Sequence, residues 1–491
     1  MFEVTFLGHQ GWQFSAGGST VLLDPLLCDQ FGHDPRGNGF DVFPPRRLDF
    51  ALCPPVDAVL FSHEHEDHFN VPSLERLERR IPIYLSVRSS AAARQILADL
   101  GFRVHLLRPG EAFAIGGLAF LPLAQASLAG SHPGEWDALA LYVRDRADHG
   151  SFFTTVDHRP QSASFEPLRQ RGLRPSLIAY ADNEQDHSAM FPWAAQGDGT
   201  ASLVEEMRYL LERAVPRENR VEAVLLCANG YATRGDLAWM NRSVFHRDPQ
   251  VVCARLREQY GERFLAPLPG DTLTLKQRRR VGPPTRSPWI HTLSEDTWPA
   301  RGAGARTAAP FGPATGRLRL DDAARAALGR ALDEFARFLY GSALFMEMYL
   351  LADASCGRRP TFAFELLEGD DIAGAHREGG TVWAWNPSAC KLVREPRGQP
   401  ENEFVAGARC WASDLLDVLE VAMPAASLTV GRLSGWNAAP DQLRFDLPNL
   451  LHMYCHPLRA PDRFLALYRG LTRGGSPVVP HTGAAGAPAG S

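Results

Sequence analysis

The sequence predicts an α/β protein followed by a smaller α+β domain. Short β-rich runs alternate with helical runs through the first half of the 491-residue chain, and a new pattern of helices and strands follows a stretch rich in Pro, Gly, Ala and Arg. A chain of this length exceeds one compact core, so we expect at least two domains. We place them at residues 1–275 and 317–473, with a linker at 276–316 and a disordered tail at 474–491.

The first domain is predicted from the periodicity of its apolar residues, which is two in strands and 3.6 in helices. The expected strands are Val4–Leu7, Thr20–Leu23, Ala58–Phe61, Ile83–Ser86, Leu118–Pro122, Ala138–Val143, Ser151–Thr155, Leu177–Tyr180 and Val221–Cys227. The expected helices are Leu74–Arg80, Ala91–Leu100 and Ala201–Ala214.

The second domain opens with a strongly amphipathic run, Asp321–Leu351. Its two leading aspartates suit the positive end of a helix dipole, so we expect a helix there. The remaining expected elements are the strands Thr361–Leu367, Thr381–Trp385, Glu403–Trp411 and Ser427–Gly431 and the helices Asp414–Val421 and Pro461–Thr472.

Composition and charge argue against several functional classes. The net charge is −5, and the one basic run, Lys276–Arg280, borders the Pro/Gly-rich stretch, so we expect no nucleic-acid partner. Eight cysteines without any CxxC pair indicate reduced thiols in a cytoplasmic protein. The N-terminus lacks the pattern of a signal peptide and no apolar run is long enough for a membrane span, which agrees with a cytoplasmic location.

The residues Ser62–Phe69, SHEHEDHF, place three histidines and an aspartate directly after an apolar strand. Residues two apart in an extended loop point the same way, so His63 and His65 can bind one ion while Asp67 and His68 serve a neighbouring position. Imidazole and carboxylate suit zinc, iron or manganese better than calcium or magnesium. A polar surface loop is the alternative, but strand ends of this kind are where α/β proteins build their sites. The motif therefore predicts a metal site.

This motif resembles the HxHxDH signature of the metallo-β-lactamase superfamily. The segment Phe6–Leu27, FLGHQGWQFSAGGSTVLLDPLL, resembles the opening hairpin of its UlaG-like branch. The resemblance covers about residues 1–275. It implies an αβ/βα four-layer sandwich with a dinuclear metal centre in the cleft between the edges of the two sheets.

By this resemblance, His63 and His65 are ligands of the first metal, and Asp67 and His68 are ligands of the second. Two divalent ions are implied, with zinc favoured and iron as the alternative. In the family a third histidine for the first metal follows a later strand, where this chain has His132 in SHPGEW. Glu135 is a rival ligand three residues on.

The bridging aspartate of the family ends a strand, as Asp157 does in SFFTTVDH. The last ligand of the family is a histidine, but this chain has Asn229 there, whose amide oxygen is a weaker ligand. The second site is therefore open, loosely held or completed by another residue such as His187 or His246.

Two residues of the opening hairpin, His9 and Asp24, are expected near the metals by resemblance. In that place Asp24 could orient a ligating imidazole through its second nitrogen. Both are otherwise ordinary turn residues.

The chemistry implied first is hydrolysis of an ester, amide, lactone or phosphodiester bond by a metal-activated water that Asp67 helps to position. The alternative is a non-haem diiron oxygenase acting on a small-molecule or carrier-bound substrate. Segments Tyr180–Trp193 and Phe264–Leu275 resemble relatives of CMP-N-acetylneuraminate hydroxylase, and the missing histidine at Asn229 favours this alternative. A non-catalytic binding module with a structural metal is the third possibility.

The second domain has no motif of comparable strength. The run Gly407–Trp436 resembles sterol-carrier-like domains, which implies a pocket for a lipid, an acyl chain or a carrier-bound substrate. His452 and His456 have the i, i+4 spacing of helical metal ligands, but Pro457 follows, so helix-end packing and capping are expected. The tryptophans expected in the core are Trp383, Trp385, Trp411 and Trp436.

Overall fold

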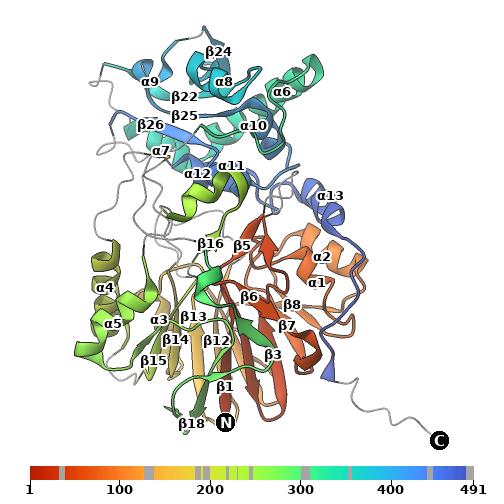
Figure 1. Ribbon diagram of the computed structural model, residues 1–491, viewed down its shortest axis with the longest axis vertical. Helices are drawn as coiled ribbons and strands as arrows, with labels where there is room; N and C mark the ends of the chain where they lie inside the picture. The colour runs from red at the N-terminus through yellow and green to blue at the C-terminus, as the bar shows by residue number, and fades with distance from the viewer. Residues whose placement is uncertain are drawn as a thin grey trace, which may run out of the picture.

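A computed structural model describes residues 1–32, 39–125, 138–182, 190–191, 199–216, 221–228, 230–242, 247–299, 310–351, 357–396, 398–439 and 446–482. The first domain stacks two sheets face to face between outer helices, and the second domain lies at one end of this sandwich (Figure 1). The αβ/βα four-layer sandwich and the second domain expected from the sequence are confirmed.

The first sheet has nine described strands in the order β19-β18-β1-β2-β3-β7-β8-β9, with β20 paired to β18. From β19 to β3 each neighbouring pair of strands is antiparallel. The strands β3, β7, β8 and β9 run parallel to one another. The bounds are β1 Phe2–Gly8, β2 Gly11–Ala16, β3 Ser19–Leu23, β7 Ala58–Leu60, β8 Ile83–Ser86, β9 Val104–Leu107, β18 Asp271–Lys276, β19 Arg279–Arg280 and β20 Thr285–Arg286.

The second sheet has seven described strands in the order β10-β11-β12-β13-β14-β15-β17, and it is parallel from β13 onward. Its bounds are β10 Phe113–Ile115, β11 Leu118–Ala124, β12 Leu139–Asp145, β13 Ser151–Thr154, β14 Leu177–Ala181, β15 Ala223–Cys227 and β17 Phe264–Leu265. Two small sheets complete the first domain. One contains β16 Tyr231–Ala232, β5 Phe40–Val42 and β4 Gln30–Phe31, and the other pairs β6 Arg46–Leu48 with β21 Ile290–Thr292.

Alternating apolar residues build three cores in the first domain. Phe14 and Phe152 meet between the sheets, where buried side chains from both inner faces form one cluster. The outer face of the first sheet packs against helices α1 (Val71–Leu74) and α2 (Ala91–Asp99). The outer face of the second sheet is covered by α3 (Ser162–Gln170), α4 (Gly199–Tyr209) with the π-helix Leu210–Ala214, and α5 (Pro249–Tyr260).

The second domain is built on a sheet of five described strands in the order β24-β23-β22-β25-β26. The strands are β22 Arg359–Leu367, β23 Thr381–Asn386, β24 Lys391–Glu395, β25 Phe404–Trp411 and β26 Ser434–Asn437. The helices are α6 Asp322–Gly341, α7 Ala343–Leu351, α8 Ile372–Glu378, α9 Pro400–Glu403, α10 Ala412–Leu419, α11 Ala425–Thr429, α12 Leu447–Tyr454 and α13 Pro461–Leu471. Trp385 and Trp411 are buried, and Trp383 and Trp436 pack against the core at partial burial, as expected.

Three expected elements differ from the structure. The helix expected at Leu74–Arg80 is the single turn α1, which Asn70 caps with its side chain and which ends at Leu74. The long helix expected at Asp321–Leu351 is divided into α6 and α7 at Ser342, which has extended backbone angles. Residues Ser427–Gly431 are not a strand, because α11 occupies Ala425–Thr429 after Pro424 and the pairing strand is β26.

The domain bounds also differ from the expected ones. The region placed in a linker contributes β19, β20 and β21, which pair with strands of the first domain. The region placed in a disordered tail is described as far as residue 482 and lies on the first domain, where Val479 is 1% exposed. The Glu75 carboxylate accepts backbone N–H groups of Arg473, Gly474 and Gly475, which fixes this segment.

The two domains share one buried apolar cluster. Phe31, Phe40 and Tyr231 of the first domain belong to the same core as Leu428 and Val430 of the second. Helix α13 lies beside α2, and Arg469 pairs with Asp99 across this contact (Figure 1). Among the helices that the structure describes, none combines the length and apolar character needed to cross a bilayer.

Candidate metal centre

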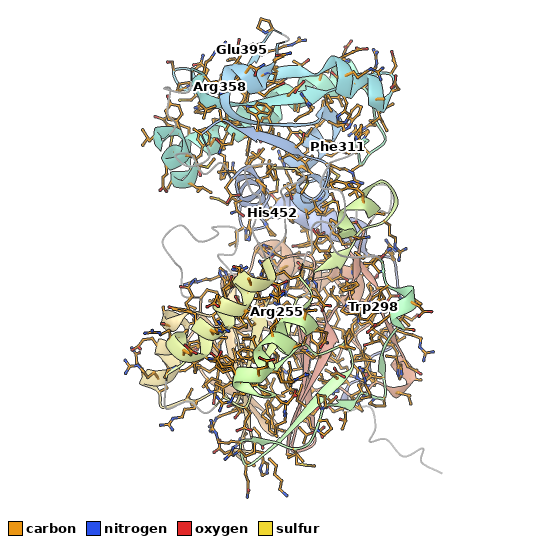
Figure 2. All side chains as sticks on the ribbon, turned by 60° about the vertical axis from the view of Figure 1, so that its left-hand side comes forward. Arg255, Trp298, Phe311, Arg358, Glu395 and His452 are labelled. Atoms are coloured by element: carbon orange, nitrogen blue, oxygen red, sulfur yellow. The ribbon has the colours of Figure 1, made fainter. Side chains whose placement is uncertain are left out.

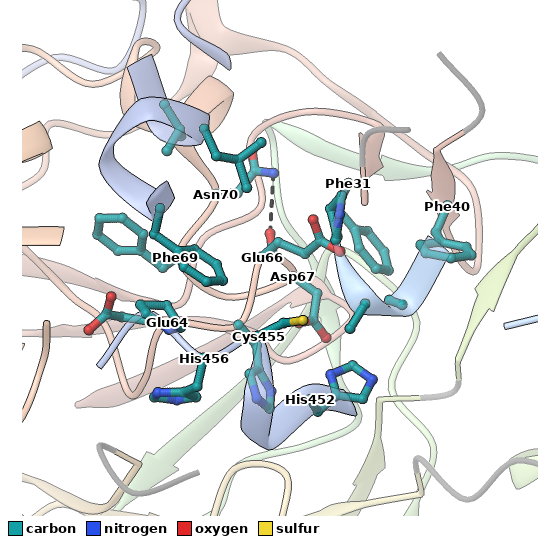
Figure 3. Close-up of a pocket in the computed structure, with 18 of the residues that line it drawn as sticks. Phe31, Phe40, Glu64, Glu66, Asp67, Phe69, Asn70, His452, Cys455 and His456 are labelled. Atoms are coloured by element: carbon teal, nitrogen blue, oxygen red, sulfur yellow. Dashed lines mark hydrogen bonds between the residues drawn. The ribbon is translucent and has the colours of Figure 1, made fainter. Parts of the chain in front are cut away.

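The loop at residues 62–69 follows β7 and is fixed at both ends. The backbone N–H groups of His68 and Phe69 both donate to the His65 carbonyl, which folds the loop into a turn. The Glu64 side chain accepts hydrogen bonds from the backbone and hydroxyl of Ser90, at the start of α2. Asn70 donates to the Glu66 carbonyl and caps α1 (Figure 3). The side chains between these anchors are therefore held in one arrangement.

One set of donor atoms comes from His63, His65 and Asp157, all within 4.8 Å of one another. The Asp157 Oδ2 atom lies 3.3 Å from His63 Nε2 and 3.8 Å from His65 Nδ1. Asp157 follows β13, and the preceding Val156 has a φ of 53°, which is a rare conformation for a β-branched residue. Gln10 donates to the Val156 carbonyl at 3.1 Å, which stabilises this turn.

A second set comes from His9, Asp67 and His68, whose donor atoms also lie within 4.8 Å of one another. His68 Nε2 is 3.2 Å from Asp157 Oδ1 and 3.6 Å from Asp67 Oδ2. His9 Nε2 lies 2.7 Å from Asp67 Oδ2, at hydrogen-bonding distance. The two oxygens of Asp157 thus face the two sets separately, which is the arrangement of a bridging carboxylate.

The buried Asp24 carboxylate determines which imidazole nitrogens face the centre. Asp24 Oδ2 accepts the Ser62 hydroxyl at 2.6 Å and lies 2.9 Å from His68 Nδ1. An ionised carboxylate has no proton to give, so His68 Nδ1 carries the hydrogen. Because the Ser62 hydroxyl hydrogen is directed to Asp24, the contact of 2.8 Å between Ser62 Oγ and His63 Nδ1 likewise requires a hydrogen on His63 Nδ1. In the neutral imidazoles, both Nε2 lone pairs point at Asp157.

These nitrogens fit a metal centre. Among the described residues, His63 Nε2, His68 Nε2 and His9 Nδ1 are buried nitrogens without a hydrogen bond, which is unfavourable unless another group binds them. Lone pairs of neutral imidazoles facing a carboxylate repel it, and a cation between them removes that repulsion. The donor set of nitrogen and oxygen atoms suits zinc, iron or manganese.

The electrostatics of these side chains indicate the same preference for positive charge. Burial lowers the pKa of His68, but Asp157, Asp67 and Asp24 outweigh it and hold that pKa well above its usual value. Burial raises the pKa of Asp157, but the charge of His68 and the close imidazoles of His63 and His65 outweigh it and hold that pKa well below its usual value. Beside them, burial and the neighbouring Asp67 raise the pKa of Glu66 to about 8.

The centre opens into a cavity of about 280 Å³ that both domains line. His452 lies where the two domains meet (Figure 2), and both His452 and His456 line the cavity (Figure 3). The rings of His452 and His65 lie 6.4 Å apart. The expected end-of-helix contacts are also present, because His456 Nδ1 accepts the Leu458 N–H at 3.2 Å and His452 Nε2 lies 3.4 Å from Thr429 Oγ1. The position of these histidines beside the centre was not expected from the sequence, where only their i, i+4 spacing was visible.

The structure brings together His9, His63, His65, Asp67, His68 and Asp157, with Asp24 behind them. The other residues considered from the sequence lie outside the described part of the chain. These residues are His132, Glu135, His187, Asn229 and His246.

Comparison with known proteins gives one family match. Residues 3–138 match the model of the beta-lactamase superfamily domain. No curated protein matches the sequence.

Three solved structures illustrate the similarity. A possible metal-dependent hydrolase from Veillonella parvula is 16% identical with a TM-score of 0.40, covering 56% of this chain and 100% of that one. The isothiocyanate hydrolase from Delia radicum gut bacteria is 15% identical with a TM-score of 0.38, covering 56% and 99%. The diiron beta-hydroxylase CmlA from Streptomyces venezuelae is 16% identical with a TM-score of 0.37, covering 56% and 54%. Similarity at this level does not show that this chain shares the activity of any of these proteins.

Proposed function

We propose that this chain, whose residues 3–138 match the beta-lactamase superfamily domain, is a metal-dependent hydrolase with two divalent cations, zinc being favoured. One observation carries the proposal. Asp157 directs one carboxylate oxygen toward His63 and His65 and the other toward His68. Two donor sets that share a carboxylate and border a cavity provide a place for two cations and a substrate.

Each residue of the centre has a role in this proposal. Divalent cations held by the two donor sets would lower the pKa of a coordinated water to about 7 and would polarise the oxygen of the bond that is attacked. Asp24 keeps the Nδ1 hydrogen of His68 in place, so that Nε2 faces the centre. His9 holds Asp67, and Asp67 helps to position the attacking oxygen. Esters, amides, lactones and phosphodiesters are all compatible, because the ligands orient the attacking oxygen and the cavity selects the substrate.

A second candidate is a non-haem diiron oxygenase. The observation that favours it is the composition of the donor sets, since each contains two imidazoles and one carboxylate. That composition with open positions is typical of non-haem iron oxygenases, which need dioxygen and an external reductant. Hydrolysis is placed first because it requires no reactant besides water.

Metal analysis followed by activity measurement tests the proposal. The full chain purified without added metal should contain two zinc ions and should hydrolyse at least one member of a panel of p-nitrophenyl esters, lactones and phosphodiesters. The His63→Ala variant should lose this activity at least a hundredfold. The His149→Ala variant is the control, because His149 precedes β13 at the end opposite Asp157.

Other outcomes separate the candidates. Iron in the purified protein, with oxygen consumption after reduction, would favour the oxygenase over the hydrolase. Protein without any transition metal, which also fails to take up zinc, would refute both.

A further inference from the structure

The cavity beside the candidate metal centre has one polar and one apolar part. His9, His65, Asp67 and Asp157 border it at the centre. Aromatic side chains from the first domain and apolar residues of the second form most of the remaining wall, to which Glu64, Glu66, Asn70, His452 and His456 add polar groups. Phe31 and Phe40 lie on one side and Phe69 on the other, with His452 and His456 below them (Figure 3). A volume of about 280 Å³ is enough for part of a small molecule.

From this arrangement we propose that the cavity receives an uncharged apolar group of the substrate, an alkyl chain or an aryl ring, while the reacting bond lies at the metals. The inference rests on the proposed metal centre and adds a substrate class to it. It also gives the second domain a function, because α11, α12 and α13 supply one wall of the cavity.

The chemistry of the wall supports an apolar group. Among the described residues that line the cavity, none is Lys or Arg, whereas Glu64, Glu66, Asp67 and Asp157 are acidic. A phosphate or carboxylate on the far part of the substrate would therefore meet no cationic partner there, and its burial would be costly. An apolar group gains free energy by leaving water in the same place.

The two sides of the cavity are held in place by packing. Phe40 and Tyr231 have ring centroids 4.5 Å apart, and both belong to the core that the domains share. On the other side, Phe69 of the first domain contacts Tyr468 of α13, with centroids 5.6 Å apart. A preformed apolar pocket binds its ligand with little cost of reorganisation.

Hydroxamates of different size test the inference on the zinc-loaded full chain, because a hydroxamate chelates zinc whatever its side group. Calorimetry would compare acetohydroxamate with octanohydroxamate and benzohydroxamate. We expect octanohydroxamate or benzohydroxamate to bind at least tenfold more tightly than acetohydroxamate, and the tighter of the two identifies an alkyl or an aryl group.

Two variants of α13 provide the matched comparison. Leu467 lines the cavity, so Leu467→Trp should fill it and abolish the tenfold gain while acetohydroxamate binding is retained. Ala466 is exposed and does not line the cavity, so Ala466→Trp should keep the gain. Zinc content and thermal unfolding of both variants verify that they fold.

The outcomes separate this inference from the proposed function. Equal affinity for all three hydroxamates, or a gain that persists in Leu467→Trp, would overturn the apolar subsite and leave an open metal centre. Failure of acetohydroxamate to bind the zinc-loaded chain would overturn the open metal centre, and the subsite with it.

Discussion

Replacing Asp24 by Asn should weaken metal binding although Asp24 faces away from the metals. Asp24 is 1% exposed, and its oxygens contact the Ser62 backbone N–H at 2.7 Å, the Ser62 hydroxyl at 2.6 Å and His68 Nδ1 at 2.9 Å. An Asn side chain can keep the bond to the Ser62 N–H through its oxygen, which leaves its NH₂ group toward the Ser62 hydroxyl and His68. His68 Nδ1 must then accept, so the hydrogen moves to Nε2, where it blocks the metal.

The size of the effect follows from the loss of one oriented ligand. Substitution of a group that orients a ligating imidazole typically lowers affinity about 10–100-fold, or roughly 1.4–2.7 kcal/mol. Zinc affinity would be measured by competition with a chromophoric chelator. Asp145→Asn is the matched control, because Asp145 is 3% exposed and accepts two backbone N–H groups but no imidazole. If Asp24→Asn and Asp145→Asn both bind zinc like the unmodified protein, the orienting role of Asp24 is refuted.

Three further predictions concern the centre, the C-terminal segment and the second domain. The His9→Ala variant should lose the metal ion of the second donor set before that of the first, because His9 contacts Asp67 and not the first donor set. Metal stoichiometry measures this loss, and simultaneous loss of both ions would contradict the prediction. The Val479→Ala variant should have a free energy of unfolding about 1–2 kcal/mol lower in urea denaturation, since Val479 is 1% exposed. An unchanged midpoint of urea unfolding would mean that this segment is not packed. Burial raises the pKa of Asp414 from 3.8 to about 6. The folded protein therefore binds this proton more tightly than the unfolded chain, so stability falls as pH rises from about 4 to 6, by on the order of 3 kcal/mol. The Asp414→Asn variant should lose this fall in stability between about pH 4 and 6, measured by thermal unfolding. An unaltered pH dependence in the variant would contradict the prediction.

The centre of the site could be predicted because its signal is local. His63, His65, Asp67 and His68 lie in one loop, and strand geometry divides them into two pairs as the structure does. By resemblance, Asp157 was expected at the end of a strand, and it follows β13 of the second sheet, close to the loop that follows β7 of the first sheet. The pairing of Asp24 with an imidazole was also expected, and the structure identifies the imidazole as that of His68.

Other features depend on contacts between distant parts of the chain. His452 and His65 are brought together by the packing of the two domains, which no local pattern contains. The residues Ser427–Gly431 have strand propensity, but tertiary packing places the first three of them in α11. Arg279 and Arg280 carry the charge pattern of a linker, yet backbone pairing with β18 makes them a strand. The segment that ends at residue 482 has a low-complexity composition, and Glu75 binds its backbone amides, for which side-chain patterns give no signal.

Metal stoichiometry of an Asp157→Ala variant tests the central claim most directly. Asp157 contacts both donor sets, so its removal should affect both metal positions together. Elemental analysis after dialysis against excess zinc and then against zinc-free buffer should give two ions for each unmodified chain and fewer than one for the variant. Two ions retained by the variant, or none bound by the unmodified chain, would contradict the account.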